Sequence, residues 1–291
     1  MQSEILSRQE LPSVPSASGI EIIDGAIYLI GDNSPFLFQL DSNYSLKEKI
    51  EIVSAGEAAN GIIPKSVKPD YEAMATAKQE NETVLLIFGS GSKSPERDSL
   101  LIIHPRSNKA DHHSLTGFYK EIKATANLTS EELNIEAAAI RNNTLYLFNR
   151  GKNVIIECSF SELMNHLTKK SKSPALKSYR IMLPASDKWK AGFSGATISN
   201  DKIVFTASVE NTINWIDDGE IIGSYVGIMP LDELKDNYSP ACFPIREKNK
   251  VLNIKAESVA VLSHVDNNID LLLVTDSDGG ASEIIGMRLM E

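Results

Sequence analysis

The sequence predicts an all-β fold: a single β-propeller of five four-stranded blades, with the first strand of each blade next to a central channel. Three observations predict it. Five segments of the chain repeat one plan, polar hairpin turns separate the apolar runs within each segment, and the two ends of the chain together supply one blade.

The repeat is the strongest of these observations. Each segment opens with an acidic or hydroxyl residue at the head of an apolar run, makes a polar turn, and enters a second, strongly apolar run. The turns include Asp24-Gly25 and Asn142-Asn143, and these residue types tolerate the positive φ angles of tight hairpins. Units spaced about sixty residues apart leave room for four antiparallel strands each. We expect one domain over residues 1–291, with blades at about 16–66, 67–128, 130–186, 190–250 and 252–291 plus 1–12.

The two ends of the chain predict how the ring closes. The last unit runs out of chain after its third strand, at 282–289, whereas the run 4–8 precedes the first unit and has no blade of its own. An N-terminal strand that completes the last blade would remove an open sheet edge. A sixth blade would require a degenerate repeat in one of two irregular stretches, 106–130 and 161–190.

One short helix is predicted within this β pattern. Over residues 159–167 the apolar side chains recur at helical spacing, and Ser161 precedes them as a candidate N-cap. We interpret this segment as an insertion between two strands of the third blade.

Charge and cysteine content limit the partners and the compartment. The net charge is −10, and an acidic surface repels phosphate backbones and anionic lipids, so we expect neither nucleic acid nor a membrane as partner. Cys158 and Cys242 fit no zinc spacing and are too few for a disulfide framework, so we interpret them as buried thiols. The N-terminus has no signal-peptide pattern, and we expect a cytoplasmic monomer.

Carboxylates recur at the start of the predicted inner strands. Four of the five units open with a glutamate: Glu21 in the first, Glu72 in the second, Glu136 in the third and Glu257 in the fifth. Ser194 holds the same place in the fourth unit. Like charges gathered around one axis repel one another, and a cation or raised pKa values would offset that repulsion. Oxygen ligands with room for water suit Ca²⁺. The alternative is structural, with the glutamates bonded to backbone amides of neighbouring blades.

The loops after the second strands are expected to border the same opening, because in a four-stranded meander they lie at the end where the first strand begins. Basic residues beside a metal would suit an anionic small molecule such as a phosphate ester. The candidate ligand-binding residues are Asn33, Ser92, Lys93, Arg97 and Arg150, and the candidate bases are Asp32 and Asp276.

Several short motifs resemble a known family. The segments 18–32 and 192–205 are similar to blade openings of the calcium-activated nucleotidases (apyrases), and the chain is also similar to phytase-like and SdiA-regulated propellers and to uncharacterised bacterial propeller proteins of this length. The resemblance implies a five-bladed propeller with a central Ca²⁺ held by Glu21, Glu72, Glu136, Ser194 and Glu257. The nucleotidases carry Asp-Asp-Arg after the second strand of the first blade, where this chain has Asp32-Asn33-Ser34.

Two hypotheses follow. The first is a Ca²⁺-binding propeller that binds an anionic small molecule and hydrolyses a phosphoester, in which the metal would polarise the phosphoryl oxygen. The second is a non-catalytic propeller that binds a ligand or a protein and whose central glutamates are structural.

Overall fold

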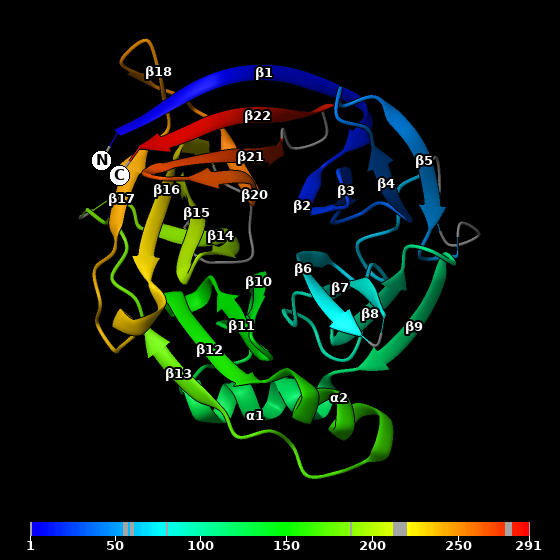
Figure 1. Cartoon of the computed structure of the whole chain (residues 1–291). Coiled ribbons are helices and arrows are strands. Elements are labelled where there is room, and N and C mark those ends of the chain that lie inside the picture. The colour runs from blue at the N-terminus through cyan, green and yellow to red at the C-terminus, as the bar shows by residue number, and fades with distance from the viewer. Residues whose placement is uncertain are drawn as a thin grey trace.

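The computed structural model describes residues 2–54, 58, 61–79, 81–186, 188–211, 220–276 and 281–290. These residues form five four-stranded antiparallel sheets, which are arranged around one axis as the blades of a propeller (Figure 1). Within each of the first four sheets the strands follow one another as a meander. The predicted five-bladed fold is confirmed.

The strands of the blades are as follows. Blade 1 contains β2 (Ala17–Ile23), β3 (Ala26–Gly31), β4 (Phe36–Leu40) and β5 (Leu46–Glu51). Blade 2 contains β6 (Tyr71–Gln79), β7 (Glu82–Gly89), β8 (Ser99–His104) and β9 (Lys109–Ser114). Blade 3 contains β10 (Ile135–Arg141), β11 (Thr144–Asn149), β12 (Val154–Ser159) and β13 (Lys177–Arg180). Blade 4 contains β14 (Ala191–Ser199), β15 (Lys202–Asn211), β16 (Glu220–Pro230) and β17 (Ala241–Pro244). Blade 5 contains β20 (Lys255–Val265), β21 (Asn268–Asp276), β22 (Ala281–Met290) and β1 (Gln2–Pro15).

The N-terminal strand closes the ring, as the ends of the chain predict. β1 pairs antiparallel with β22, from Gln2 opposite Met290 to Pro15 opposite Ala281. It also contributes Leu11 and Val14 to the core, where they are 3% and 1% exposed. Closure therefore covers the edge of β22 and buries apolar area in the same step.

The hydrophobic core lies between neighbouring blades. Five clusters of buried side chains each join residues of adjacent blades, for example Ile30 of β3 with Tyr71 of β6, and Phe148 of β11 with Phe193 of β14. Such strands are covered on both faces, which is why their sequences read as nearly continuous apolar runs rather than as alternating ones.

The predicted irregular stretches hold helices and not a sixth blade. α1 (Thr116–Ala126) connects blades 2 and 3, and α2 (Phe160–Lys169) lies between β12 and β13 (Figure 1). The predicted cap of α2 is corrected, because its N-cap is Ser159, whose side chain accepts a hydrogen bond from the Glu162 amide. Two 3₁₀ turns (η2, Gly151–Asn153, and η3, Leu231–Glu233) and a two-residue hairpin pair, β18 (Arg246–Glu247) with β19 (Lys250–Val251), complete the described elements. No helix in the described part of the chain is long and apolar enough to cross a membrane.

Candidate functional site

The first strands of the blades surround the axis, and each begins with a β-bulge. β2, β6, β10, β14 and β20 contact one another in ring order (Figure 1). In each of them one residue is left out of the pairing with the second strand, and a bulge of this kind redirects the side chain that it carries. The bulged residues are Ser18, Glu72, Glu136, Ser194 and Glu257.

The register corrects one predicted member of the ring. Ser18, and not Glu21, is equivalent to the three bulged glutamates, and Glu21 instead pairs with Tyr28 further along β2. Burial raises the pKa of Glu21 to about 8, although the Ile22 backbone lowers it somewhat.

The two bulged serines bind protein rather than project toward a ligand. The Ser18 hydroxyl donates to the Tyr71 carbonyl at 2.6 Å, and the Ser194 hydroxyl donates to the Ala256 carbonyl at 2.6 Å. Tyr71 and Ala256 directly precede the bulged residues of the next blades, so the two contacts are equivalent and join neighbouring inner strands. Ser194 therefore makes a structural contact between blades, and its role as a Ca²⁺ ligand stays a prediction.

Around the three bulged glutamates lies a network of buried charges, which we call the axial cluster. It consists of six carboxylates and four cations: Asp32, Asp70, Glu72, Glu136, Glu210 and Glu257, with Lys68, Arg97, Arg150 and Lys255.

One half of the axial cluster is built around Asp70. Its Oδ1 lies 2.6 Å from Lys68 Nζ, and its Oδ2 lies 2.6 Å from Arg97 Nη1. Lys68 Nζ also lies 2.5 Å from Asp32 Oδ2, and the Ser92 hydroxyl accepts from Arg97 at 2.7 Å. Lys68, Asp70 and Arg97 are each less than 10% exposed, so their charges are compensated by one another and only weakly by water.

The other half lies across blades 3, 4 and 5. Arg150 donates to Glu210 at 2.7 Å and to the Ser208 hydroxyl at 3.0 Å. Lys255 Nζ lies 2.9 Å from Glu257 Oε1 and 3.5 Å from Glu210 Oε1. A Cβ at Gly192 would lie 2.7 Å from Arg150 Cγ, so the glycine leaves the room through which Arg150 reaches β15.

Glu72 and Glu136 join the two halves. Burial raises the pKa of Glu72 well above its usual range, the charges of Asp70, Glu136 and Asp32 raise it further, and Lys68 opposes them. Burial likewise raises the pKa of Glu136 to about 8, despite Arg150 nearby, and the Asn134 amide donates to its Oε1 at 2.6 Å. Repulsion therefore acts on both glutamates, on Glu72 from Asp70, Asp32 and Glu136, and on Glu136 from Glu257 and Glu210.

Not every predicted ligand-binding residue belongs to the axial cluster. Lys93 is exposed and binds Glu96 and the Ser66 carbonyl. Asn33 follows Asp32, and its Oδ1 is buried with no partner in the part of the chain that the structure describes. Asp276 ends β21 opposite Lys255, and the predicted loop residues after it, 277 and 278, lie outside the described residues.

Lys68, Asp70 and Lys255 were not predicted as site residues, although a signal for them exists. Polar residues alternate at the strand starts, as in Lys68-Pro69-Asp70-Tyr71-Glu72 and Lys255-Ala256-Glu257. Alternate residues of a strand lie on one face, so an inner strand that begins in this way places its charges together.

Comparison with known proteins identifies the family. The model of a family of unknown function, DUF6929, matches residues 13–289. The chain belongs to this family. No curated protein matches it with significant similarity.

Solved structures resemble this DUF6929 member in fold alone. A GH43 β-1,3-galactosidase, BT0265, is 10% identical with a TM-score of 0.57, over 97% of this chain and 60% of its own. A glutaminyl cyclase of Myxococcus xanthus is 9% identical with a TM-score of 0.54, over 99% and 97%. The tail fibre of Staphylococcus aureus phage P68 is 11% identical with a TM-score of 0.53, over 99% and 53%.

Proposed function

We propose that this protein binds a hard divalent cation, with Ca²⁺ the first candidate, at Asp32, Asp70 and Glu72. The observation that carries the proposal is convergence: each of these carboxylates offers an oxygen, and the three oxygens lie within 4.8 Å of one another. Oxygen-only donors suit Ca²⁺. Asp32 Oδ1 and Asn33 Oδ1 are buried without a partner among the described residues, and each is a further donor of the kind that such an ion uses.

The charge balance of the axial cluster supports a cation as ligand. Its six carboxylates outnumber its four cations by two, and the raised pKa values of Glu72 and Glu136 indicate that protons make up this difference; one divalent ion in place of these two protons would balance the same charge. Uncompensated charge in a buried site is costly. An added cation near Glu72 would reduce the repulsion among Glu72, Asp70 and Glu136.

Lys68 is the internal competitor of such an ion. Its ammonium lies 2.5 Å from Asp32 and 2.6 Å from Asp70, so it contacts two of the three carboxylates that would hold the metal. Binding of Ca²⁺ therefore requires Lys68 to withdraw. A lysine has four rotatable carbon–carbon bonds along its stem and can do so without movement of the backbone.

Hydrolysis of a phosphoester is the second candidate, and Arg97 is the observation that favours it. Its Nη1 is shared between Asp70 and Ser92, whereas its Nε is buried with no partner in the described part of the chain. An anion bound to the metal could accept a hydrogen bond from that Nε. Arg150 does not favour an anion, because both of its bonds go to Glu210 and Ser208.

The test is a thermal melt of chelator-treated protein with and without added Ca²⁺. A ligand present at about one hundred times its Kd stabilises the folded state by about 2.7 kcal/mol. The unfolding entropy of a 291-residue chain, at about 2.1 cal/mol/K per residue, is about 0.6 kcal/mol/K, so Tm should rise by about 4–5 °C. Glu72→Gln should lose this rise and Lys68→Met should increase it.

Asp111→Asn is the matched control, because Asp111 is a carboxylate on β9 with a side chain that is 63% exposed. It should keep the full response to Ca²⁺. If neither the wild type nor Lys68→Met responds, the carboxylates are structural, with lysine and arginine as their counterions, and the metal proposal is wrong. If Ca²⁺ binds, turnover of p-nitrophenyl phosphate that is lost in Arg97→Gln would support hydrolysis, and absence of turnover would leave a binding function.

A further inference from the structure

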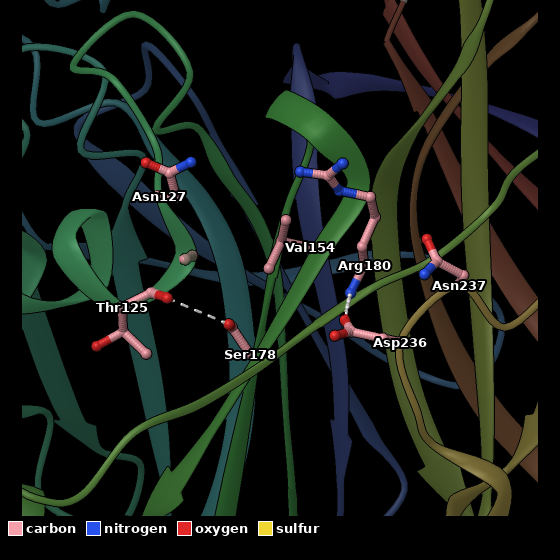
Figure 2. A pocket seen from close by; sticks show the side chains of 8 residues that line it. Thr125, Asn127, Val154, Ser178, Arg180, Asp236 and Asn237 are labelled. Atoms are coloured by element: carbon pink, nitrogen blue, oxygen red, sulfur yellow. Dashed lines mark hydrogen bonds between the residues drawn. The ribbon is translucent and has the colours of Figure 1, made fainter.

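We propose a second ligand site, for a small zwitterion of the α-amino-acid class, in a cavity on the outer part of the ring where blade 3 meets blade 4. The cavity has a volume of about 240 Å³ and lies between the C-terminus of α1, the strands β12 and β13, and the loop that follows η3 (Figure 2). It shares no residue with the axial cluster, so this proposal is independent of the cation site.

Two opposite charges line this cavity without pairing with each other. The Arg180 backbone amide donates to Asp236 Oδ1 at 2.9 Å, while the Arg180 guanidinium extends away from that carboxylate (Figure 2). The guanidinium has neither a hydrogen-bond nor an ion-pair partner among the residues that the structure describes. A ligand that carries both charges would pair with both groups at once.

The cavity favours a carboxylate on one side and an ammonium group on the other. Arg180 presents a planar fork of donors, which matches a carboxylate, and the side-chain amides of Asn127 and Asn237 lie on either side of it (Figure 2). Asp236 carries the negative charge of the lining, and the last carbonyls of α1, which ends at Ala126, add partial negative charge.

The floor of the cavity limits the side chain of the ligand. Val154 is 3% exposed and Ala126 is 9% exposed, so both present small apolar surfaces. Together with the volume, this floor suits a short apolar side chain, as in alanine. A large aromatic or a charged side chain would not be matched there.

The walls are held in place before any ligand binds. The Asn237 backbone amide donates to the Arg180 backbone carbonyl at 2.7 Å, and Lys152 Nζ donates to the Asn127 backbone carbonyl at 3.0 Å. A wall that is already ordered lowers the entropic cost of binding.

The test is an NMR titration of ¹⁵N-labelled protein with L-alanine, followed at the side-chain amides of Asn127 and Asn237. Acetate and methylammonium are the single-charge probes. We expect saturable shifts with L-alanine, and binding weaker by about tenfold or more for each single-charge probe, since each forfeits one charged contact. Arg180→Gln should abolish the shifts caused by L-alanine. It leaves the backbone bond to Asp236 intact, so it should fold.

Two further variants make the result decisive. Arg106→Gln removes an exposed arginine in the turn after β8 and should bind L-alanine as the wild type does. Asp236→Asn keeps an acceptor for the Arg180 amide but loses the negative charge, so it should bind L-alanine and acetate equally. The proposal is overturned if L-alanine causes no saturable shift. It is also overturned if acetate binds the wild type as tightly as L-alanine does, which would indicate a simple anion site.

Discussion

Replacement of Lys68 by methionine tests whether the protein's own cations hold the axial cluster together. The Lys68 side chain is 11% exposed and that of Asp70 is 6% exposed, so the pair is shielded from solvent. Removal of one partner from a buried ion pair costs about 3–5 kcal/mol, because the other charge stays buried. With an unfolding entropy of about 0.6 kcal/mol/K for 291 residues, Tm should fall by roughly 5–8 °C. Methionine keeps the length of the carbon stem, so the lost volume is limited to that of the ammonium group.

Calorimetric melts in the presence of a chelator measure this change without interference from metal. Lys93→Met is the matched control, since Lys93 is 48% exposed and its partner Glu96 is 38% exposed. An exposed pair of this kind contributes at most about 1 kcal/mol, so the control should shift Tm by less than about 2 °C. An unchanged or raised Tm in Lys68→Met would refute the reasoning, because it would mean that the cost of burying the ammonium cancels its attraction to Asp32 and Asp70.

Three further predictions concern the inner strands. Ser194→Ala leaves the buried Ala256 carbonyl without its donor and should cost about 1–3 kcal/mol in urea unfolding, with no change in Ca²⁺ response; a neutral effect would contradict the bonding role of the bulged serines. Glu21→Gln tests the pKa of the Glu21 carboxyl, which burial raises to about 8. The folded protein keeps the proton that the unfolded chain loses above about pH 4.5. The stability of the wild type therefore falls as pH rises from about 4.5 to 8. The variant should match the wild type at pH 4 and exceed it by up to roughly 5 kcal/mol at pH 9, and identical pH profiles would show that Glu21 ionises freely. Gly192→Ala should displace Arg150 and cost about 1–3 kcal/mol by differential scanning calorimetry, whereas a tolerated methyl group would show that Arg150 has another route to Glu210.

The fold could be predicted because its signals are local and repeated. Turns such as Asp24-Gly25 separate apolar runs, and the structure has positive φ at Asp24, Gly25, Asn142, Asn143, Asn200 and Asp201. Closure by β1 could be predicted because an unpaired third strand and an unassigned N-terminal run complement each other. Repetition makes such a prediction robust, since an error in one unit is corrected by the others.

The helix α1 shows where local signals were insufficient. Its buried residues Phe118, Tyr119, Ile122 and Ala126 recur at helical spacing. Gly117 near its start weakens the pattern, and Leu115 at the N-cap makes no side-chain capping bond, so the start of the helix carried no recognisable signal.

The identity of the axial residues depended on register, and the prediction aligned Glu21 by its residue type rather than by its distance from the hairpin turn. Glu21 shares its residue type with Glu72, Glu136 and Glu257, yet a bulge at Ser18 places the equivalent side chain earlier in β2. The distance to the hairpin turn identifies Ser18 instead, because Ser18 precedes Asp24 by the same number of residues as Glu136 precedes Asn142 and Ser194 precedes Asn200. Of the cations that compensate the carboxylates, Lys68 and Lys255 were missed although each lies two residues before a carboxylate that it contacts or faces, in Lys68-Pro69-Asp70 and Lys255-Ala256-Glu257.

The place at the axis where a cation would bind depends on which of the bulged residues lack a counterion, and not on the ring of five positions as a whole. Blades 1 and 4 place hydroxyls at the bulge, and these bind backbone carbonyls. Blade 5 places Glu257 there, and Lys255 neutralises it at 2.9 Å. Glu72 and Glu136 remain: the charge of Glu136 raises the pKa of Glu72, and the Asn134 amide donates to Glu136. A cation added beside Glu257 would gain little, whereas one added beside Glu72 would relieve three unfavourable charge pairs at once. The axial site should therefore be sensitive to Glu72→Gln and tolerant of Glu257→Gln, although the two residues occupy equivalent positions in the repeat.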